Sequence, residues 1–82
     1  MSLTVQFGKK MRDYRDDRPV NVIADRVGCG RRAIENMEAG RTLPRLQVYV
    51  RLCRAYKLTL PQRAELDEIA SGIAAEAEPE GE

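Results

Sequence analysis

The stretch VNVIADRVGCGRRAIENMEAG, residues 20 to 40, decides the fold that the sequence predicts. It contains two short helical segments that are joined at a glycine. Helices that cross closely need a small residue at the crossing, and Ala24 supplies it in the first segment. A sharp turn needs a residue that adopts a positive φ, and Gly28 supplies it four residues later. The apolar residues expected to hold both segments against a core are Ile23, Val27, Cys29, Ile34 and Met37.

Helical patterns flank this stretch on both sides and predict an all-α fold of five helices. Phe7, Met11 and Tyr14 recur at helical spacing and form one apolar stripe. Thr59 and Gln62 are spaced as a capping box, which predicts the start of the last helix. Prolines and glycines lie between the periodic segments, where they start and stop helices. The predicted helices cover residues 5–17, 19–28, 31–39, 44–56 and about 60–77.

The last two predicted helices also carry apolar stripes. In the fourth helix we expect Leu46, Tyr49, Leu52, Cys53 and Tyr56 to point inward. The two tyrosines on this stripe are therefore predicted to be core residues and not platforms for stacked bases. The stripe of the fifth helix consists of Leu66, Ile69, Ala70, Ile73 and Ala77.

The net charge of +1 conceals two regions of opposite sign. Residues 1–57 hold 13 Lys and Arg against 6 Asp and Glu, a net charge of +7. Residues 58–82 hold one Arg against 7 acidic residues, a net charge of −6. A basic domain of this size suits a polyanionic partner, because each phosphate that it neutralises releases counterions.

The residue types present argue against an enzyme, a metal site or a cofactor. The chain has no His, and neither Cys29 nor Cys53 has a companion base or metal ligand. We expect both cysteines to be reduced, inward-facing thiols. No apolar run is long enough to span a bilayer and the N-terminus has no signal pattern, so we expect a cytoplasmic protein without a membrane partner. Because we expect no enzyme, we also expect no small-molecule substrate.

The stretches ADRVGCGRRAI and AIENMEAGRTLPRLQVYVRLCRAY, with KKMRDYR upstream, resemble the phage-repressor family of Cro and lambda repressor, the XRE-like helix-turn-helix proteins. The resemblance covers about residues 7–69. It implies a five-helix lambda-repressor-like DNA-binding domain whose helix-turn-helix comprises helices 2 and 3. Helix 3, residues 31–39, would be the recognition helix that enters the major groove of double-stranded DNA.

The resemblance also implies a role for the exposed face of helix 3, which carries Arg31, Arg32, Glu35 and Asn36. In the family, such positions contact base edges. The chemistry agrees, because Arg bonds guanine, Asn bonds adenine, and Glu accepts a hydrogen bond from cytosine. Glu35 has an alternative role, since it could pair with Arg31 or Arg32 and hold them until the correct base is met.

Contacts to the DNA backbone are expected from residues next to the recognition helix. Arg41, Thr42 and Arg45 lie in the following loop and at the start of the next helix, whose free N–H groups favour phosphate. Lys10 is a further candidate, with a solvated surface role as the alternative. The family commonly has Gln where this chain has Val20, and its first connection is longer, so Asn21 or Arg18 is expected to replace the usual phosphate contact.

Two residues are implied to be structural. In the family an Arg of the first helix pairs with the Glu of the Glu-x-Gly sequence that ends the recognition helix. Arg15 and Glu38 match these positions, and a partly buried salt bridge between them would fix the angle of helix 3.

The fifth helix is a candidate dimer element of a single domain that spans residues 1–77. Its stripe of Leu66, Ile69, Ile73 and Ala77 would mediate a homodimer, or would pack on helices 1 and 4 of the same chain. A homodimer would place two recognition helices about 34 Å apart on a palindromic site. Residues 78–82 are predicted to be a disordered acidic tail.

Together these features predict a sequence-specific transcription regulator, acting as a repressor. The alternative is an antitoxin or another protein-interaction module of the same fold, which would bind a protein such as a toxin.

Overall fold

The computed structural model describes residues 2–77, and within this range it contains α-helices and no strand. The all-α prediction with five helices is therefore confirmed. The predicted tail, residues 78–82, lies outside the described residues. The helices are α1 (Leu3–Arg15), α2 (Val20–Val27), α3 (Arg31–Glu38), α4 (Leu46–Ala55) and α5 (Leu60–Ala77).

Helix α1 begins and ends two residues earlier than the sequence predicted. It begins early because the Ser2 hydroxyl accepts a hydrogen bond from the backbone N–H of Val5, at 3.2 Å. It ends at Arg15 because Asp16 has a φ of 55°, in the left-handed region. The Asp16 N–H still donates to the Arg12 carbonyl, at 3.1 Å, so the reversal closes the last turn of the helix.

The turn between α2 and α3 has the predicted geometry. Gly28 has a φ of 75°, and its N–H donates to the Ala24 carbonyl at 2.9 Å. The N–H of Cys29 donates to the same carbonyl at 3.0 Å. Ala24 itself is only 5 % exposed, as expected of a residue at a helix crossing. The turn therefore fixes where α3 leaves the body of the protein.

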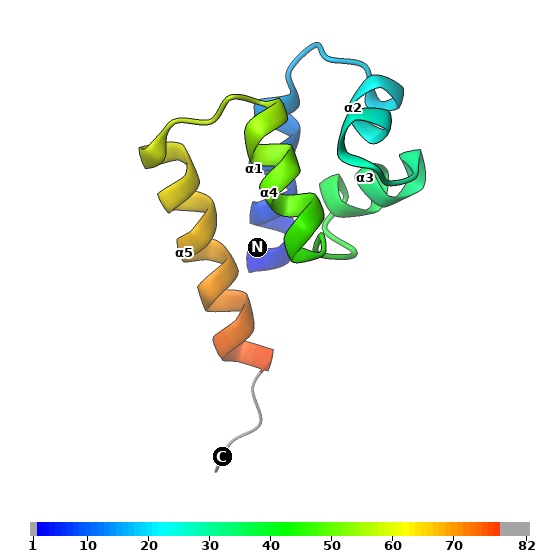
Figure 1. Cartoon of the computed structure of the whole chain (residues 1–82). Helices are drawn as coiled ribbons and strands as arrows, with labels where there is room; N and C mark the ends of the chain where they lie inside the picture. The colour runs from blue at the N-terminus through cyan, green and yellow to red at the C-terminus, as the bar shows by residue number, and fades with distance from the viewer. Residues whose placement is uncertain (1, 78–82) are drawn as a thin grey trace.

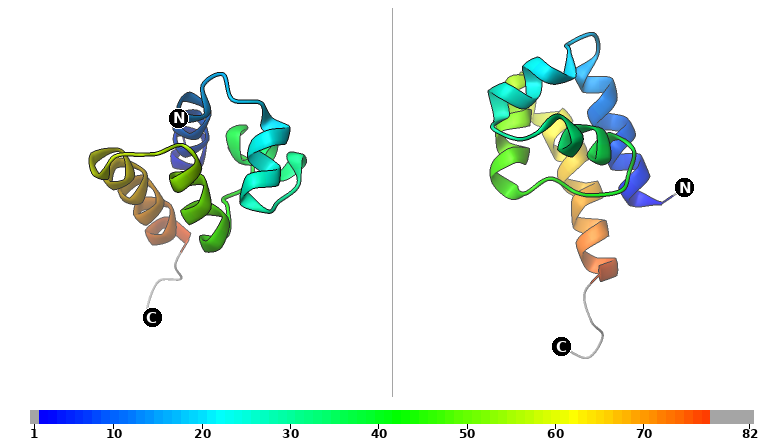
Figure 2. Two further views of the ribbon diagram at one scale, coloured as in Figure 1. Left: turned by 45° about the horizontal axis from the view of Figure 1, so that its top comes forward. Right: turned by 90° about the vertical axis from the view of Figure 1, so that its right-hand side faces the viewer.

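Helix α1 separates α5 from the helix-turn-helix. It packs against α3 on one side and against α5 on another, while α2 packs against α3 and α4. Figures 1 and 2 show α5 on the opposite side of the molecule from α2 and α3. The core between these helices includes the fully buried side chains of Phe7, Met11, Ile23, Val27, Ile34, Met37, Leu52 and Leu66.

The start of α4 differs from the prediction. The helix begins at Leu46 and not at Pro44, and the Leu46 side chain is 75 % exposed although an inward position was expected. Leu52, Cys53 and Tyr56 are buried as expected. Tyr49 is half-buried, and its hydroxyl donates to Asp67 of α5 at 2.6 Å.

Helix α5 confirms one prediction and corrects another. The Thr59 N–H donates to the Gln62 side chain at 2.9 Å, and the Gln62 N–H donates to the Thr59 hydroxyl at 3.3 Å, which is the predicted capping box. Leu66 was expected at a dimer interface, but it is 0 % exposed because it packs into the core of its own chain. Ile69 and Ile73 also pack against that core and are half-buried. The side chain of Ala77 lies outside the description.

Both cysteines are free, and Cys53 is buried while Cys29 is half-buried. Burial raises the pKa of both thiols. None of the described helices combines the length and the apolar character that crossing a bilayer requires.

Candidate nucleic-acid interface

Helix α3 presents four polar side chains on one side and buries two apolar ones on the other. Ile34 and Met37 are 1 % and 2 % exposed and anchor the helix to the core. On the opposite side, Arg31, Arg32 and Glu35 are exposed and Asn36 is half-buried. We refer to Arg31, Arg32, Glu35 and Asn36 as the readout face. Because α3 spans only Arg31–Glu38, this face occupies most of its length.

Three members of the readout face already have polar partners. Arg31 Nε lies 3.0 Å from Glu35 Oε2, one helical turn away. Arg41 Nη1 donates to Asn36 Oδ1 at 3.2 Å. By contrast, Arg32 forms no ion pair within the part of the chain that the structure describes. The face therefore offers one unpaired guanidinium beside a neutralised one.

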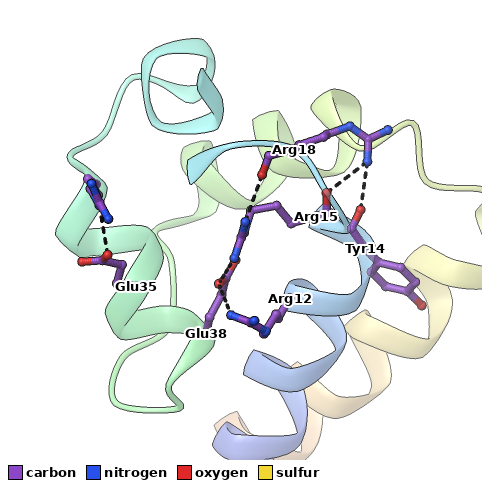
Figure 3. Close-up of polar contacts among 7 residues, drawn as sticks. Arg12, Tyr14, Arg15, Arg18, Glu35 and Glu38 are labelled. Atoms are coloured by element: carbon purple, nitrogen blue, oxygen red, sulfur yellow. Dashed lines mark hydrogen bonds and ion pairs between the residues drawn. The ribbon is translucent and has the colours of Figure 1, made fainter. Parts of the chain in front are cut away.

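Arg15 of α1 and Glu38 of α3 form a nearly buried, two-pronged ion pair (Figure 3). Arg15 Nε lies 2.6 Å from Glu38 Oε2, and Arg15 Nη2 lies 2.9 Å from Glu38 Oε1. Their side chains are 12 % and 7 % exposed. The hydrogen bond to Glu38 raises the pKa of Arg15, so the guanidinium stays charged. The pair thus ties the C-terminal end of α3 to α1.

The backbones of α1 and α3 also approach closely at this end. A Cβ atom at Gly8 would overlap the carbonyl oxygens of Met37 and Glu38. Only glycine leaves room for α1 at this place, so packing and the ion pair fix the same end of α3. Gly8 was not among the residues predicted from the sequence, although a glycine inside a helical pattern is a recognised sign of close packing.

Arg12 is a second residue that was not predicted from the sequence. Its Nη1 lies 4.0 Å from Glu38 Oε1, and its side chain is 70 % exposed (Figure 3). It borders a hollow of about 340 Å³ that is also lined by Arg15, Val20, Glu35, Glu38 and Ala39. The spacing of three residues between Arg12 and Arg15 places both on the same side of α1, which is the pattern that could have identified it.

Arg18 does not fill the position expected of a phosphate contact. Its Nη1 donates to the Tyr14 carbonyl at 3.0 Å, and its guanidinium carbon lies 5.7 Å from the centre of the Tyr56 ring. Arg18 is therefore committed to the connection between α1 and α2 (Figure 3). Burial raises the pKa of Tyr56 to about 12, so this ring stays neutral. Asn21, the other expected substitute, is exposed in the first turn of α2.

The loop after α3 presents further cationic and polar groups to solvent. Arg41, Thr42 and Arg45 are all exposed, and Arg45 occupies the N-cap position of α4. No side chain accepts the N–H groups of the first turn of α4 at that cap. An anion placed here would meet a guanidinium and a helix N-terminus together.

Lys10 lies on another side of the molecule from the one expected. Its Nζ lies 2.8 Å from Glu65 Oε2, and the two side chains are 39 % and 59 % exposed. The phosphate role of Lys10 stays a prediction, and the pairing with Glu65 is closer to the alternative of a solvated surface residue.

One comparison with known proteins identifies the family. The model of a family described as a helix-turn-helix domain matches residues 6–66, which is most of the chain and spans α2, α3 and α4 completely. No curated protein and no solved structure shows significant similarity to the chain. The matched range contains the turn at Gly28, the readout face and the Arg15–Glu38 pair. The chain belongs to the helix-turn-helix domain family.

Proposed function

We propose that the protein is a sequence-specific regulator of transcription that binds double-stranded DNA with α3 in the major groove, and that it acts as a repressor. The observation that carries this proposal is the readout face, because its four polar side chains project from a helix whose far end is fixed by the Arg15–Glu38 pair. A recognition helix needs polar side chains that point toward the DNA, and it needs to be held in a fixed orientation by the rest of the protein.

Within the readout face, Arg32 is the primary base contact. It is exposed and makes no ion pair among residues 2–77, so binding a guanine breaks no existing bond. A two-bond contact to guanine O6 and N7 contributes about 1–3 kcal/mol of discrimination. Asn36 is suited to adenine, although it must first release Arg41.

Glu35 acts as a selector of DNA sequence. In the free protein it neutralises Arg31, so Arg31 does not add to unspecific attraction by phosphates. Where a cytosine is present, Glu35 accepts a hydrogen bond from N4 and frees Arg31 for a neighbouring guanine. At guanine or thymine, whose major-groove edges present no donor, the Glu35 carboxylate gains no hydrogen bond from that base, and Arg31 remains held. This mechanism favours specificity over affinity.

Backbone contacts come from both sides of α3. Arg41, Thr42 and Arg45 follow the recognition helix, while Asn21 and Arg12 lie before it or beside it. Arg12 extends over the hollow next to Val20, where the family commonly has a phosphate-binding Gln. We infer that Arg12 replaces that contact, since it is 70 % exposed and its ion pair with Glu38 is loose.

The functional unit is a homodimer on a palindromic site. A single α3 of eight residues reads only a few base pairs, and two copies about 34 Å apart would double the information read. The sequence pattern suggested α5 as the interface, but Leu66 of that stripe is buried in its own chain, and Ile69 and Ile73 are half-buried.

The proposal is tested by selecting duplexes from a random pool and titrating the best one by fluorescence anisotropy at several salt concentrations. We expect a defined consensus, and binding that weakens steeply with salt because phosphates are neutralised. A scrambled duplex of equal length is the control. Equal binding to both duplexes, or no salt-dependent binding, would falsify the proposal.

The second candidate function is an antitoxin-like protein-interaction module. It is favoured by the Arg31–Glu35 pair, which halves the free positive charge of the readout face, and by Val20 in place of the usual Gln. A protein that purifies with a bound partner and shows no duplex preference would support this candidate.

A further inference from the structure

Two exposed leucines lie together where the α3–α4 loop enters α4. Leu43 is 41 % exposed and Leu46 is 75 % exposed, and Pro44 lies between them in the chain. They are two of the four large hydrophobic side chains that are exposed among residues 2–77; the other two, Val22 and Leu60, lie on α2 and at the start of α5. We refer to Leu43, Pro44 and Leu46 as the loop–α4 patch.

The patch borders a hollow of about 220 Å³. Besides the three patch residues, the hollow is lined by Phe7 of α1, Tyr49 of α4 and Ala70 of α5. The Tyr49 hydroxyl is already bonded to Asp67, so the lining offers an occupant almost only apolar surface. A small molecule would find no polar group there to orient it, whereas an apolar side chain would fit.

An occupant of this hollow has to present a protruding apolar side chain. The patch itself presents such a side chain, Leu46, directly beside the hollow.

We propose that the loop–α4 patch is the self-association surface of this protein, in which Leu46 of each copy enters the hollow of the other. A two-fold interface uses the same surface twice, so it requires a projection and a hollow on one patch. This inference rests on the proposed homodimer and names its contact.

The position of the patch is suited to a dimer that binds DNA. Leu43 lies between Thr42 and Arg45, the groups proposed to contact phosphates. A two-fold axis through the patch therefore keeps both loops next to each other and next to the DNA. An axis through α5 would instead pass through the side opposite to α2 and α3 (Figures 1 and 2).

The patch is too small to hold a stable dimer in free solution. Stable interfaces bury about 800 Å² on each partner, and the patch has only three side chains. Arg41 and Arg45 flank it, and in a dimer these like charges would repel until phosphates neutralise them. We therefore expect weak self-association in free solution and cooperative assembly of two copies on DNA.

The test compares two matched variants of the full chain. Leu46→Gln removes the projecting side chain, and Leu60→Gln makes the same change at the exposed leucine of α5. Neither change alters charge, and thermal melting followed by circular dichroism checks that both variants fold. Affinity is measured on a duplex with the full selected site and on one with a single half-site, and sedimentation velocity gives the number of bound copies.

We expect Leu46→Gln to bind the half-site like the wild type and the full site at least about tenfold more weakly, with loss of cooperativity. Leu60→Gln should match the wild type on both duplexes. Cooperative binding by Leu46→Gln, or an equal loss in Leu60→Gln, overturns the interface.

Failure of DNA binding itself is a separate outcome. If the wild type prefers no duplex, the proposed function fails, and sedimentation equilibrium at millimolar protein then tests the patch alone. The wild type should show dimers that Leu46→Gln lacks and Leu60→Gln retains. A wild type that is monomeric at that concentration and shows no cooperativity overturns the inference.

Discussion

Helix α1 holds a neighbouring helix on each of two sides, and it does so with ion pairs of different kinds. Toward α3, Arg15 and Glu38 form two short bonds and are 12 % and 7 % exposed. Toward α5, Lys10 and Glu65 share one contact of 2.8 Å and are 39 % and 59 % exposed. The same helix therefore has a nearly buried, two-bond ion pair on one side, which we call the clamp, and a solvent-exposed ion pair on another.

The difference shows which neighbour has to be held at a fixed angle. A buried two-pronged pair fixes geometry, but it becomes costly if one partner is lost. An exposed lysine pair is screened by solvent and contributes little. Since the readout face lies on α3, the clamp supports the side with the proposed DNA contacts, while α5 is held mainly by apolar packing around Leu66.

The largest expected effect comes from breaking the clamp. Glu38→Ala leaves the Arg15 guanidinium buried without its partner, which should lower the free energy of unfolding by about 3–5 kcal/mol. Urea denaturation measures this loss. The matched control is Glu65→Ala, which should leave the denaturation midpoint almost unchanged. Similar losses in the two variants would remove the distinction between the two sides of α1.

The next largest effect is the loss of DNA affinity, which should differ between a residue on α3 and a residue on the side of α1 that faces α5. Arg32→Ala should weaken binding to the selected site by about 1–3 kcal/mol and relax the preference at one base pair. Lys10→Ala, on the α5 side, should leave affinity and salt dependence unchanged because Lys10 is neutralised by Glu65. Anisotropy titrations on a panel of single-base variants measure both. A loss of affinity in Lys10→Ala would support its predicted phosphate contact.

A smaller effect separates base contacts from backbone contacts within the α3 side. Arg45→Ala should weaken binding to all duplexes alike and reduce the slope of log K against log salt by about one unit. The control is Arg32→Ala on the same panel. If Arg45→Ala changes the base preference instead, Arg45 contacts a base edge and the proposed assignment is wrong.

The smallest effect is the pH dependence of the exposed pair. Bonding to Lys10 lowers the pKa of Glu65 in the folded protein. The Lys10–Glu65 pair therefore adds to the stability of the folded protein above the ordinary pKa of glutamate, about 4.3. This contribution is lost as the pH falls through the lowered pKa of Glu65. Melting temperatures of the wild type and Glu65→Gln should converge on acidification. A difference that grows in acid would mean that the pair stabilises the protonated form.

The sequence predicted the order and most of the ends of the helices well, because the residues that start and stop a helix act on their near neighbours in the chain. Gly28 ends α2, and the pair of Thr59 and Gln62 caps α5, since each depends only on residues a turn away. The partnership of Arg15 and Glu38 required the family resemblance, because the two residues are 23 positions apart. Sequence periodicity alone holds no information about such a distance.

What the sequence did not predict depends on how helices diverge in space. Leu46 has the spacing of a core residue, but α4 begins where its neighbours leave a hollow, so the side chain is exposed. Leu66 has the spacing of an interface residue, but α1 lies close enough to cover it. Lys10 was predicted to contact phosphate, yet its position on α1 turns it toward Glu65.

The placement of α5 behind the helix-turn-helix makes the protein an electric dipole. Residues 60–77 hold one arginine against four carboxylates, whereas residues 1–57 carry a net charge of +7. In the field of a polyanion such a molecule experiences a torque that turns its basic side forward before contact. Productive orientation is thus favoured during the encounter, which raises the association rate at low salt. The same acidic helix would repel a second duplex that approached from the α5 side.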